Sequence, residues 1–138
     1  TFSLNDTVGE RTRENGFTEG FIISNGIFKE DLGGGVSQMA TTTFNAAFFA
    51  GLKDIEHKPH SFYIDRYPVG REATVAWGAV DLQFQNDAPY GVLIEARVPP
   101  GSASASGVVT VSMWSTSSEG HSEAHAAAGS PTAITDSS

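Results

Sequence analysis

The sequence contains no cysteine, which removes disulfides, thiolate metal sites and thiol catalysis together. Basic residues are scarce, because eight Lys and Arg stand against sixteen Asp and Glu for a formal charge of −8. A nucleic-acid surface needs a basic patch, so we expect no nucleic-acid partner. No apolar run reaches the roughly 18 residues that a membrane span needs. We therefore expect no direct membrane insertion by this chain.

The chain opens on Thr1 without an initiator methionine and carries no signal peptide. We expect a fragment of a longer protein, so the missing signal does not bear on export of the parent. The 138 residues, 39% of them hydrophobic, suit one globular domain. Beyond residue 115 the only large aliphatic side chain is Ile134. We therefore predict a domain over 1–114 and a disordered tail over 115–138.

The pattern of apolar residues and turn signals predicts an α+β fold, with one buried central helix packed on a mainly antiparallel β-sheet. The helix is expected over 36–50, ended by Gly51, and three threonines within it lower its intrinsic propensity. Residues 1–30 read as short β-prone pieces and turns, including a hairpin over 20–28 through Asn25-Gly26. Further strands are expected, the last two as an antiparallel pair, at 60–67, 73–77, 81–84, 92–98 and 108–114.

The most informative stretch runs Gly33-Gly34-Gly35-Val36-Ser37-Gln38. Glycines before a helix let the backbone approach a ligand, and the first helical turn presents free N–H groups with partial positive charge. A nucleophile at Ser37 could use those groups as an oxyanion hole. The alternative is a tight turn in which Ser37 only caps the helix.

His60 and Arg71 are the other candidates. His60 could act as general base, or it could be structural. Arg71 could clamp a substrate carboxylate with its planar fork, or it could pair internally with Glu72, Asp65 or Asp81. The stretch 121–125, His-Ser-Glu-Ala-His, is not a His-Glu-x-x-His zinc motif. We therefore expect no metal and no cofactor.

Together these motifs resemble the VanW family. The resemblance covers about residues 1–98 and rests on the order of these stretches: Phe2-Ser3-Leu4-Asn5, Gly9-Glu10-Arg11-Thr12, Asn15-Gly16-Phe17, 33–38, 42–46, His60-Ser61, 70–75 and 81–86. The family is named for a component of a glycopeptide-resistance cluster. Its members are exported or membrane-anchored bacterial proteins, often beside peptidoglycan-binding domains. The resemblance implies an extracytoplasmic, cell-envelope location.

Many members carry Gly-Gly-Gly-Val-Cys-Gln, and some are linked to L,D-transpeptidation with that Cys as proposed nucleophile. By position the resemblance makes Ser37 and His60 the catalytic pair. It assigns substrate binding to Gly34, Gly35, Gln38, Arg71 and Thr74. Serine replaces the thiol here and is far less acidic, so a Cys–His pair does not convert to Ser–His without stronger activation. Ser37 is an engineered trap, a natural branch with a binding role, or a true serine nucleophile; we favour the natural branch.

Three hypotheses follow. In the first, the domain recognises peptidoglycan stem peptides or muropeptides at the start of the 36–50 helix, with acyl transfer weak or absent. In the second it is an active acyltransferase or peptidase, with Ser37, His60 and an orienting residue such as Asp81 or Asn86. In the third it is a structural adaptor between envelope domains. The sequence leaves the oligomeric state open.

Overall fold

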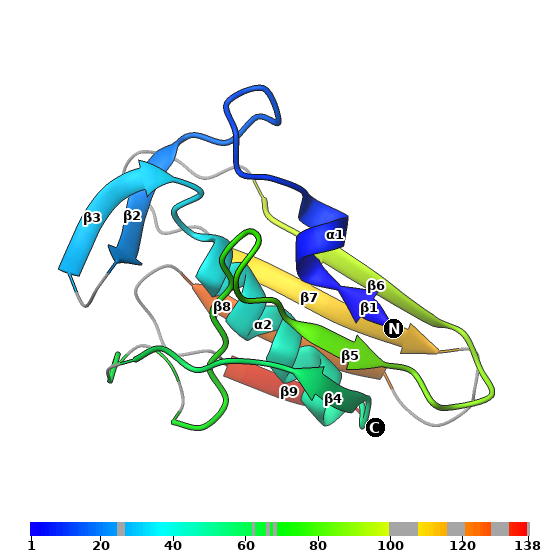
Figure 1. The fold of residues 1–138 in the computed structure, drawn as a ribbon. Coiled ribbons are helices and arrows are strands. Elements are labelled where there is room, and N and C mark those ends of the chain that lie inside the picture. Colours follow the sequence, from blue (N-terminus) through cyan, green and yellow to red (C-terminus); the bar gives the residue numbers. More distant parts are fainter. Residues whose placement is uncertain are drawn as a thin grey trace.

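The computed structural model describes residues 1–24, 27–61, 63–65, 67, 69–99, 108–115, 121–127 and 133–137. Its helices are α1 (Leu4–Val8) and α2 (Val36–Phe49). Its strands, drawn in Figure 1, are β1 (Phe2–Ser3), β2 (Glu19–Ser24), β3 (Ile27–Leu32), β4 (Lys53–Glu56), β5 (Gln83–Gln85), β6 (Val92–Arg97), β7 (Val108–Ser115), β8 (His121–Ala127) and β9 (Ala133–Ser137). Helix and antiparallel sheet together make the α+β fold that the sequence predicts.

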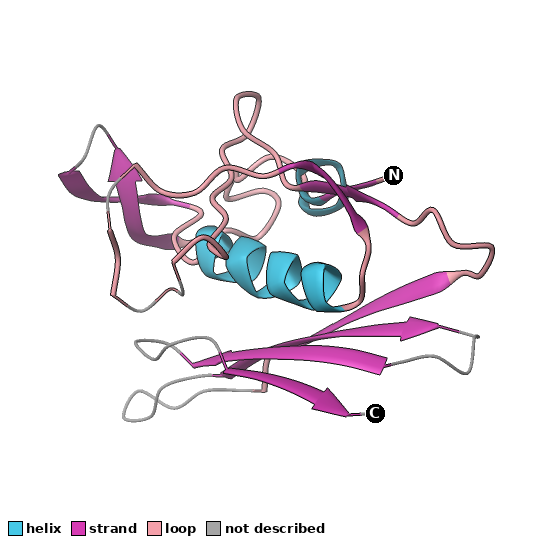
Figure 2. Cartoon of the chain, turned by 90° about the horizontal axis from the view of Figure 1, so that it is seen from below, coloured by secondary structure: helices cyan, strands magenta, loops and turns pink. Residues whose placement is uncertain are grey.

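The strands form three antiparallel groups with the orders β1-β5-β4, β2-β3 and β6-β7-β8-β9. Helix α2 lies between the last group and the layer that contains β1, β4 and β5 (Figure 2). No helix in the described ranges has the length and apolar character needed to cross a membrane. The first turn of α2 lies beside the β2-β3 hairpin (Figure 1).

Helix α2 is buried along its middle, as predicted, from Ala40 to Ala47. The hydrophobic core joins it to α1, β5 and β7 through Leu4, Ala40, Phe44, Ala46, Ala47, Ala73, Leu82, Phe84, Val111 and Met113. The helix ends in a Schellman motif, because Leu52 N–H donates to Ala47 O at 3.0 Å and Gly51 N–H donates to Phe48 O at 3.1 Å. Gly51 takes the positive φ of 74° that this ending requires.

Two predicted strand pairs are confirmed. β2 and β3 pair from Glu19↔Leu32 to Ser24↔Ile27, and their turn at Asn25-Gly26 lies outside the described residues. β6 and β7 pair antiparallel, with Val92 opposite Ser115.

Three local predictions were wrong. No strand covers 73–77, where only the isolated bridges Lys58↔Thr74 and Ala76↔Val80 form. Helix α1 replaces part of the β-prone stretch at the N-terminus, and its signal was Ser3 followed by Asp6, since Ser3 Oγ accepts from Asp6 N–H at 3.0 Å. No strand covers the described part of 60–67, where Ile64 and Tyr67 are both buried and Tyr67 N–H donates to Ile64 O at 3.1 Å. Their spacing of three residues belongs to a turn rather than to an alternating strand.

The structure describes two further strands within the C-terminal stretch 115–138. β8 pairs with the free edge of β7, β9 pairs with β8, and both contact α2. An open strand edge offers backbone N–H and C=O groups that a following segment can pair with, whatever its side chains are. Amino-acid composition indicates how many side chains can be buried, and it does not indicate backbone pairing at a strand edge.

Candidate functional site

A groove of about 850 Å³ opens at the N-terminal end of α2. It is lined by the loop before α2, the first turn of α2, the segment 58–67 and the segment 74–80. Its lining residues are Arg11, Ile22, Leu32, Gly33, Gly35, Val36, Ser37, Gln38, Lys58, Pro59, His60, Ser61, Ile64, Tyr67, Thr74, Val75, Ala76, Trp77 and Val80. Its volume lies in the range of small-molecule pockets, and its lining combines apolar side chains with a few polar groups.

The glycine loop shapes the start of α2. Gly35 is the N-cap residue with φ at 90°, and no side chain caps the helix. Its carbonyl oxygen accepts from Gln38 N–H at 3.1 Å and Met39 N–H at 3.2 Å. Nothing in the described ranges accepts a hydrogen bond from Ser37 N–H. The groove therefore meets a free donor at the positive end of the helix dipole.

Ser37 does not cap α2, which corrects the structural alternative drawn from the sequence. Its Oγ lies 3.0 Å from Thr74 Oγ1. Thr74 is fixed in turn, because its N–H donates to Lys58 O at 2.8 Å in an isolated β-bridge. Two residues far apart in sequence are thus joined by their hydroxyls at the base of the groove.

His60 lines the groove and pairs with Glu72, which is not one of the lining residues. His60 Nδ1 lies 2.8 Å from Glu72 Oε2, and the two side chains are only 6% and 13% exposed. The Tyr67 ring stacks on the imidazole, with centroids 5.2 Å apart and planes 6° from parallel. The carboxylate accepts the Nδ1 proton, which leaves Nε2 as the second ring nitrogen that can exchange a proton.

The residues named from sequence as partners of His60 lie elsewhere. Asp81 accepts from Asn5 N–H at 2.9 Å, and Asn86 accepts from Ala88 N–H at 3.1 Å. Partial burial opposes the ionisation of Asp81, but hydrogen bonds led by that from Ser3 outweigh burial and lower its pKa. Glu72 takes the orienting position instead. The motif that contains Arg71 and Glu72 did not indicate that the Glu72 carboxylate would reach the His60 imidazole.

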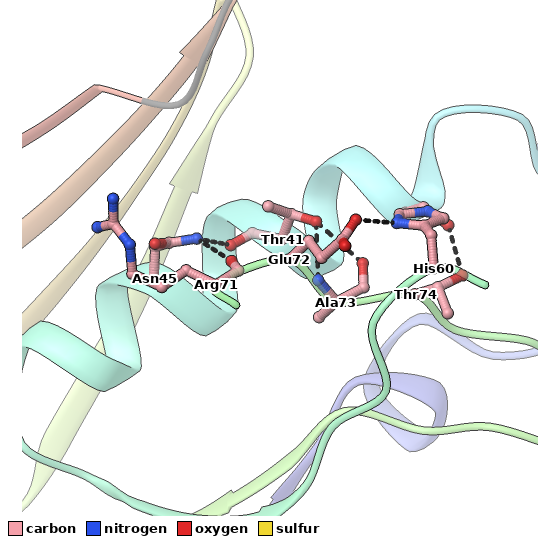
Figure 3. A network of polar contacts seen from close by, with 8 residues as sticks. Thr41, Asn45, His60, Arg71, Glu72, Ala73 and Thr74 are labelled. Atoms are coloured by element: carbon pink, nitrogen blue, oxygen red, sulfur yellow. Dashed lines mark hydrogen bonds and ion pairs between the residues drawn. The ribbon is translucent and has the colours of Figure 1, made fainter. Parts of the chain in front are cut away.

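A polar strip on α2 holds segment 71–74 in place (Figure 3). Thr41 Oγ1 donates to Ala73 O at 2.9 Å and accepts from Ala73 N–H at 3.0 Å. One turn later, Asn45 Nδ2 donates to Arg71 O at 2.7 Å. Thr41, one of the threonines that weaken helix propensity, and Asn45 therefore dock the segment that carries Glu72 and Thr74 on α2.

Arg71 lies outside the groove, at the opposite end of this strip from His60 (Figure 3). Its guanidinium sits 5.3 Å from the centre of the Phe49 ring. Gly34 is also not one of the groove-lining residues, and its Cα would lie 3.0 Å from a Cβ built on Gly20. Gly35, Ser37, Gln38, His60 and Thr74 are the sequence-predicted residues that the structure brings together.

Arg11 is a groove residue that sequence reasoning missed. Its NH1 donates to Gly9 O and its NH2 to Asn5 Oδ1, each at 2.7 Å. Its guanidinium carbon lies 5.9 Å from the centre of the Trp77 ring. Burial lowers the pKa of Arg11, and the negative charge of Asp81 partly opposes that shift. The motif Gly9-Glu10-Arg11-Thr12 was noticed only as a family signature, with no indication of where it folds.

Comparison with known proteins gives two matches. The family described as VanW like protein matches residues 1–114. The chain is also 42% identical over 102 residues to the uncharacterized protein YoaR of Bacillus subtilis (strain 168), which covers 74% of this chain. The chain spans about a third of that relative, 34% of its length. No solved structure matches the chain. Because the family match extends over most of the chain, this protein belongs to the VanW family.

Proposed function

We propose that this domain is an extracytoplasmic module of the cell envelope whose groove binds peptidoglycan stem peptides, with acyl transfer weak or absent. The groove at the start of α2 is the observation that carries the proposal. It combines an apolar lining with Ser37, Gln38 and Thr74, which suits a short peptide that offers both methyl groups and amides. The envelope location rests on the family.

Free hydrogen-bond donors support a peptide ligand. Gln38 Nε2 is buried and has no partner in the described part of the chain. Ser37 N–H, in the first turn of α2, also has no acceptor among the described residues. A buried donor without a partner costs about 1–3 kcal/mol of stability. A ligand whose carbonyl oxygens accept hydrogen bonds from these donors would therefore bind more tightly. A peptide bound in an extended form presents such carbonyls at regular intervals.

The position of the Ser37 hydroxyl supports weak chemistry. Its hydrogen bond goes to Thr74, a neutral hydroxyl that is no general base. A serine needs a base to become a nucleophile, because its own hydroxyl is far less acidic than a thiol. In this arrangement the groove holds a ligand but does not generate an alkoxide.

The test compares three ligands: a disaccharide tetrapeptide muropeptide, its free tetrapeptide, and the disaccharide without peptide. We expect the first two to bind by calorimetry, the third not to bind, and the mass of each ligand to stay unchanged. Binding of the disaccharide alone would place recognition on the glycan and contradict the proposal. New product masses would contradict its inactive part.

The paired His60 and Glu72 favour a second candidate, acyl transfer through Ser37. In that reaction Ser37 Oγ gives its proton to His60 Nε2, attacks the peptide carbonyl, and the leaving amine takes the proton. Thr74→Val removes the competing hydroxyl while keeping the side-chain shape. If this candidate holds, Thr74→Val keeps or raises product formation and Ser37→Ala abolishes it. No product from the wild type or from Thr74→Val would sink it.

A further inference from the structure

We propose that Arg11 is the carboxylate-binding residue of the groove, so that the peptide it takes carries a free carboxylate beside Trp77. This inference rests on the proposed peptide-binding function and names the ligand group that the groove selects. It moves the clamp from Arg71, which lies over Phe49 outside the groove, to an arginine at the groove itself.

The charge of the groove points to an anionic ligand. The chain carries a net charge of −8. Within the described residues, however, the titratable side chains that line the groove are Arg11, Lys58, His60 and Tyr67, with no Asp or Glu among them. Neither Arg11 nor Lys58 forms an ion pair in those residues. Asp81 acts on Arg11 electrostatically from beyond ion-pair distance, but neither Arg11 nor Lys58 has a paired carboxylate in the described part of the chain, so a ligand carboxylate would still meet positive charge.

Arg11 is held in place before any ligand arrives. Its two hydrogen bonds go to neutral oxygens, Gly9 O and Asn5 Oδ1, which orient the guanidinium without cancelling its charge. The Trp77 ring covers one side of the guanidinium at 5.9 Å. A guanidinium has five N–H donors, so three remain for a ligand. A fixed planar fork is the geometry that binds carboxylates by two parallel hydrogen bonds.

The glycine loop contributes directly to this placement. A Cβ built on Gly33 would lie 2.7 Å from Arg11 Cγ, closer than side chains pack. Gly33 also has φ at 85°. The missing side chain at residue 33 leaves the space in which the Arg11 stem lies. Arg11 and the loop before α2 thus form one unit that faces the groove.

The experiment measures how much a ligand carboxylate contributes to binding. The probes are N-acetylated trialanine peptides, in all-L and all-D forms, each with a free C-terminal carboxylate or a carboxamide. Binding to the isotope-labelled chain is followed by NMR. We expect amidation to weaken binding about tenfold or more in the wild type, since hydrogen bonds to charged groups contribute about 1.5–3 kcal/mol. We also expect the free acid to lose affinity as salt rises.

Variants locate the effect. In Arg11→Gln the penalty for amidation should vanish, while Arg97→Gln, an exposed arginine paired with Glu95, should keep it. Equal binding of acid and amide by the wild type, or no binding of either, overturns the proposal. So does an unchanged penalty in folded Arg11→Gln, or a penalty lost in Arg71→Gln instead. If Arg11→Gln does not fold, Lys58→Gln decides: the penalty for amidation should persist in that variant, and its loss there would assign the effect to Lys58 and overturn the proposal.

The design separates this inference from the proposed function. Carboxylate-dependent binding of trialanine with no preference for stem peptides would keep the role of Arg11 and remove the peptidoglycan assignment. Stem-peptide binding that ignores amidation of every ligand carboxylate would keep the function and remove the role of Arg11.

Discussion

His60 Nδ1 lies 2.8 Å from Glu72 Oε2, both side chains are largely buried, and the Tyr67 ring stacks on the imidazole. The segment with Glu72 is docked on α2 by Thr41 and Asn45, so the orientation of the imidazole depends on the helix that begins the groove. The carboxylate and the helix together fix a single ring orientation and leave Nε2 as the exchangeable nitrogen.

Glu72→Gln should loosen this fixed tautomer. The Glu72 carboxylate only accepts, which forces the proton of neutral His60 onto Nδ1, whereas a Gln amide can donate or accept. The ¹⁵N shifts of the His60 ring should therefore report the Nδ1–H tautomer in the wild type and a mixture in Glu72→Gln. Asp65→Asn, a change at an exposed neighbour, serves as the control. A ring that shows the Nε2–H tautomer in the wild type would refute the pairing.

Ser37→Cys should create an acidic thiol. The first turn of α2 stabilises an anion at this position. The pH dependence of alkylation reports the pKa of what is then the only thiol of the chain. Ser61→Cys provides a matched thiol that lines the same groove away from the helix end. An apparent pKa for Ser37→Cys at or above the model value of about 8.5 would count against an anion-stabilising site.

Gly33→Ala should weaken binding of carboxylate peptides more than Gly16→Ala. Both glycines have similar positive φ angles, 85° and 87°, so the backbone strain of the two alanines is matched. Only Gly33 faces Arg11, while nothing lies within 4 Å of a Cβ at Gly16. Urea unfolding measures the shared strain of roughly 1–2 kcal/mol, and peptide titration measures the difference. Equal losses of affinity in the two variants would mean that Gly33 does not position Arg11.

Asp81→Asn should remove part of the acid sensitivity of the fold. The pKa of Asp81 is lowered in the folded state, so its ionised form stabilises the fold above the unfolded-state value of 3.8. That stabilisation disappears as pH falls through the lower, folded-state pKa. Melting temperatures of wild type and variant should therefore differ at neutral pH and converge in acid, whereas Asp87→Asn at an exposed turn should run parallel to the wild type. A gap that widens in acid would reverse the sign of this account.

Truncation after Ser115 should change the melting temperature little. β8 and β9 add backbone pairs, and each hydrogen bond contributes about 0.5–1.5 kcal/mol net. Ordering each residue costs about 1–2 kcal/mol, and the segment has only Ile134 as a large aliphatic side chain. The two contributions nearly cancel. A drop of several degrees would show that the strands stabilise α2 and that the domain extends past residue 114.

The sequence predicted those parts of the fold whose signals are local. Helix α2, its Gly51 ending and the two hairpin pairings follow from periodicity and glycine chemistry over a few residues. The groove could be predicted only at Gly35, Ser37, Gln38, His60 and Thr74, which belong to recognisable motifs. Glu72 and Arg11 were not predicted as site residues. The position of Glu72 depends on the hydrogen bond between Thr41 and the Ala73 backbone, and that of Arg11 on its contact with Trp77. No local sequence pattern encodes either contact.

The central claim is that a stem peptide occupies the groove at the start of α2. Its most direct test is to map which residues change their NMR chemical shifts when the peptide binds. Amide resonances of the ¹⁵N-labelled chain are followed as the free stem tetrapeptide is added. The account predicts saturable shifts at Ser37, Gln38 and Thr74, with those of β6 and β7 residues such as Arg97 and Thr110 unmoved. Shifts confined to the strands, or none at concentrations that saturate other peptide-binding domains, would contradict it.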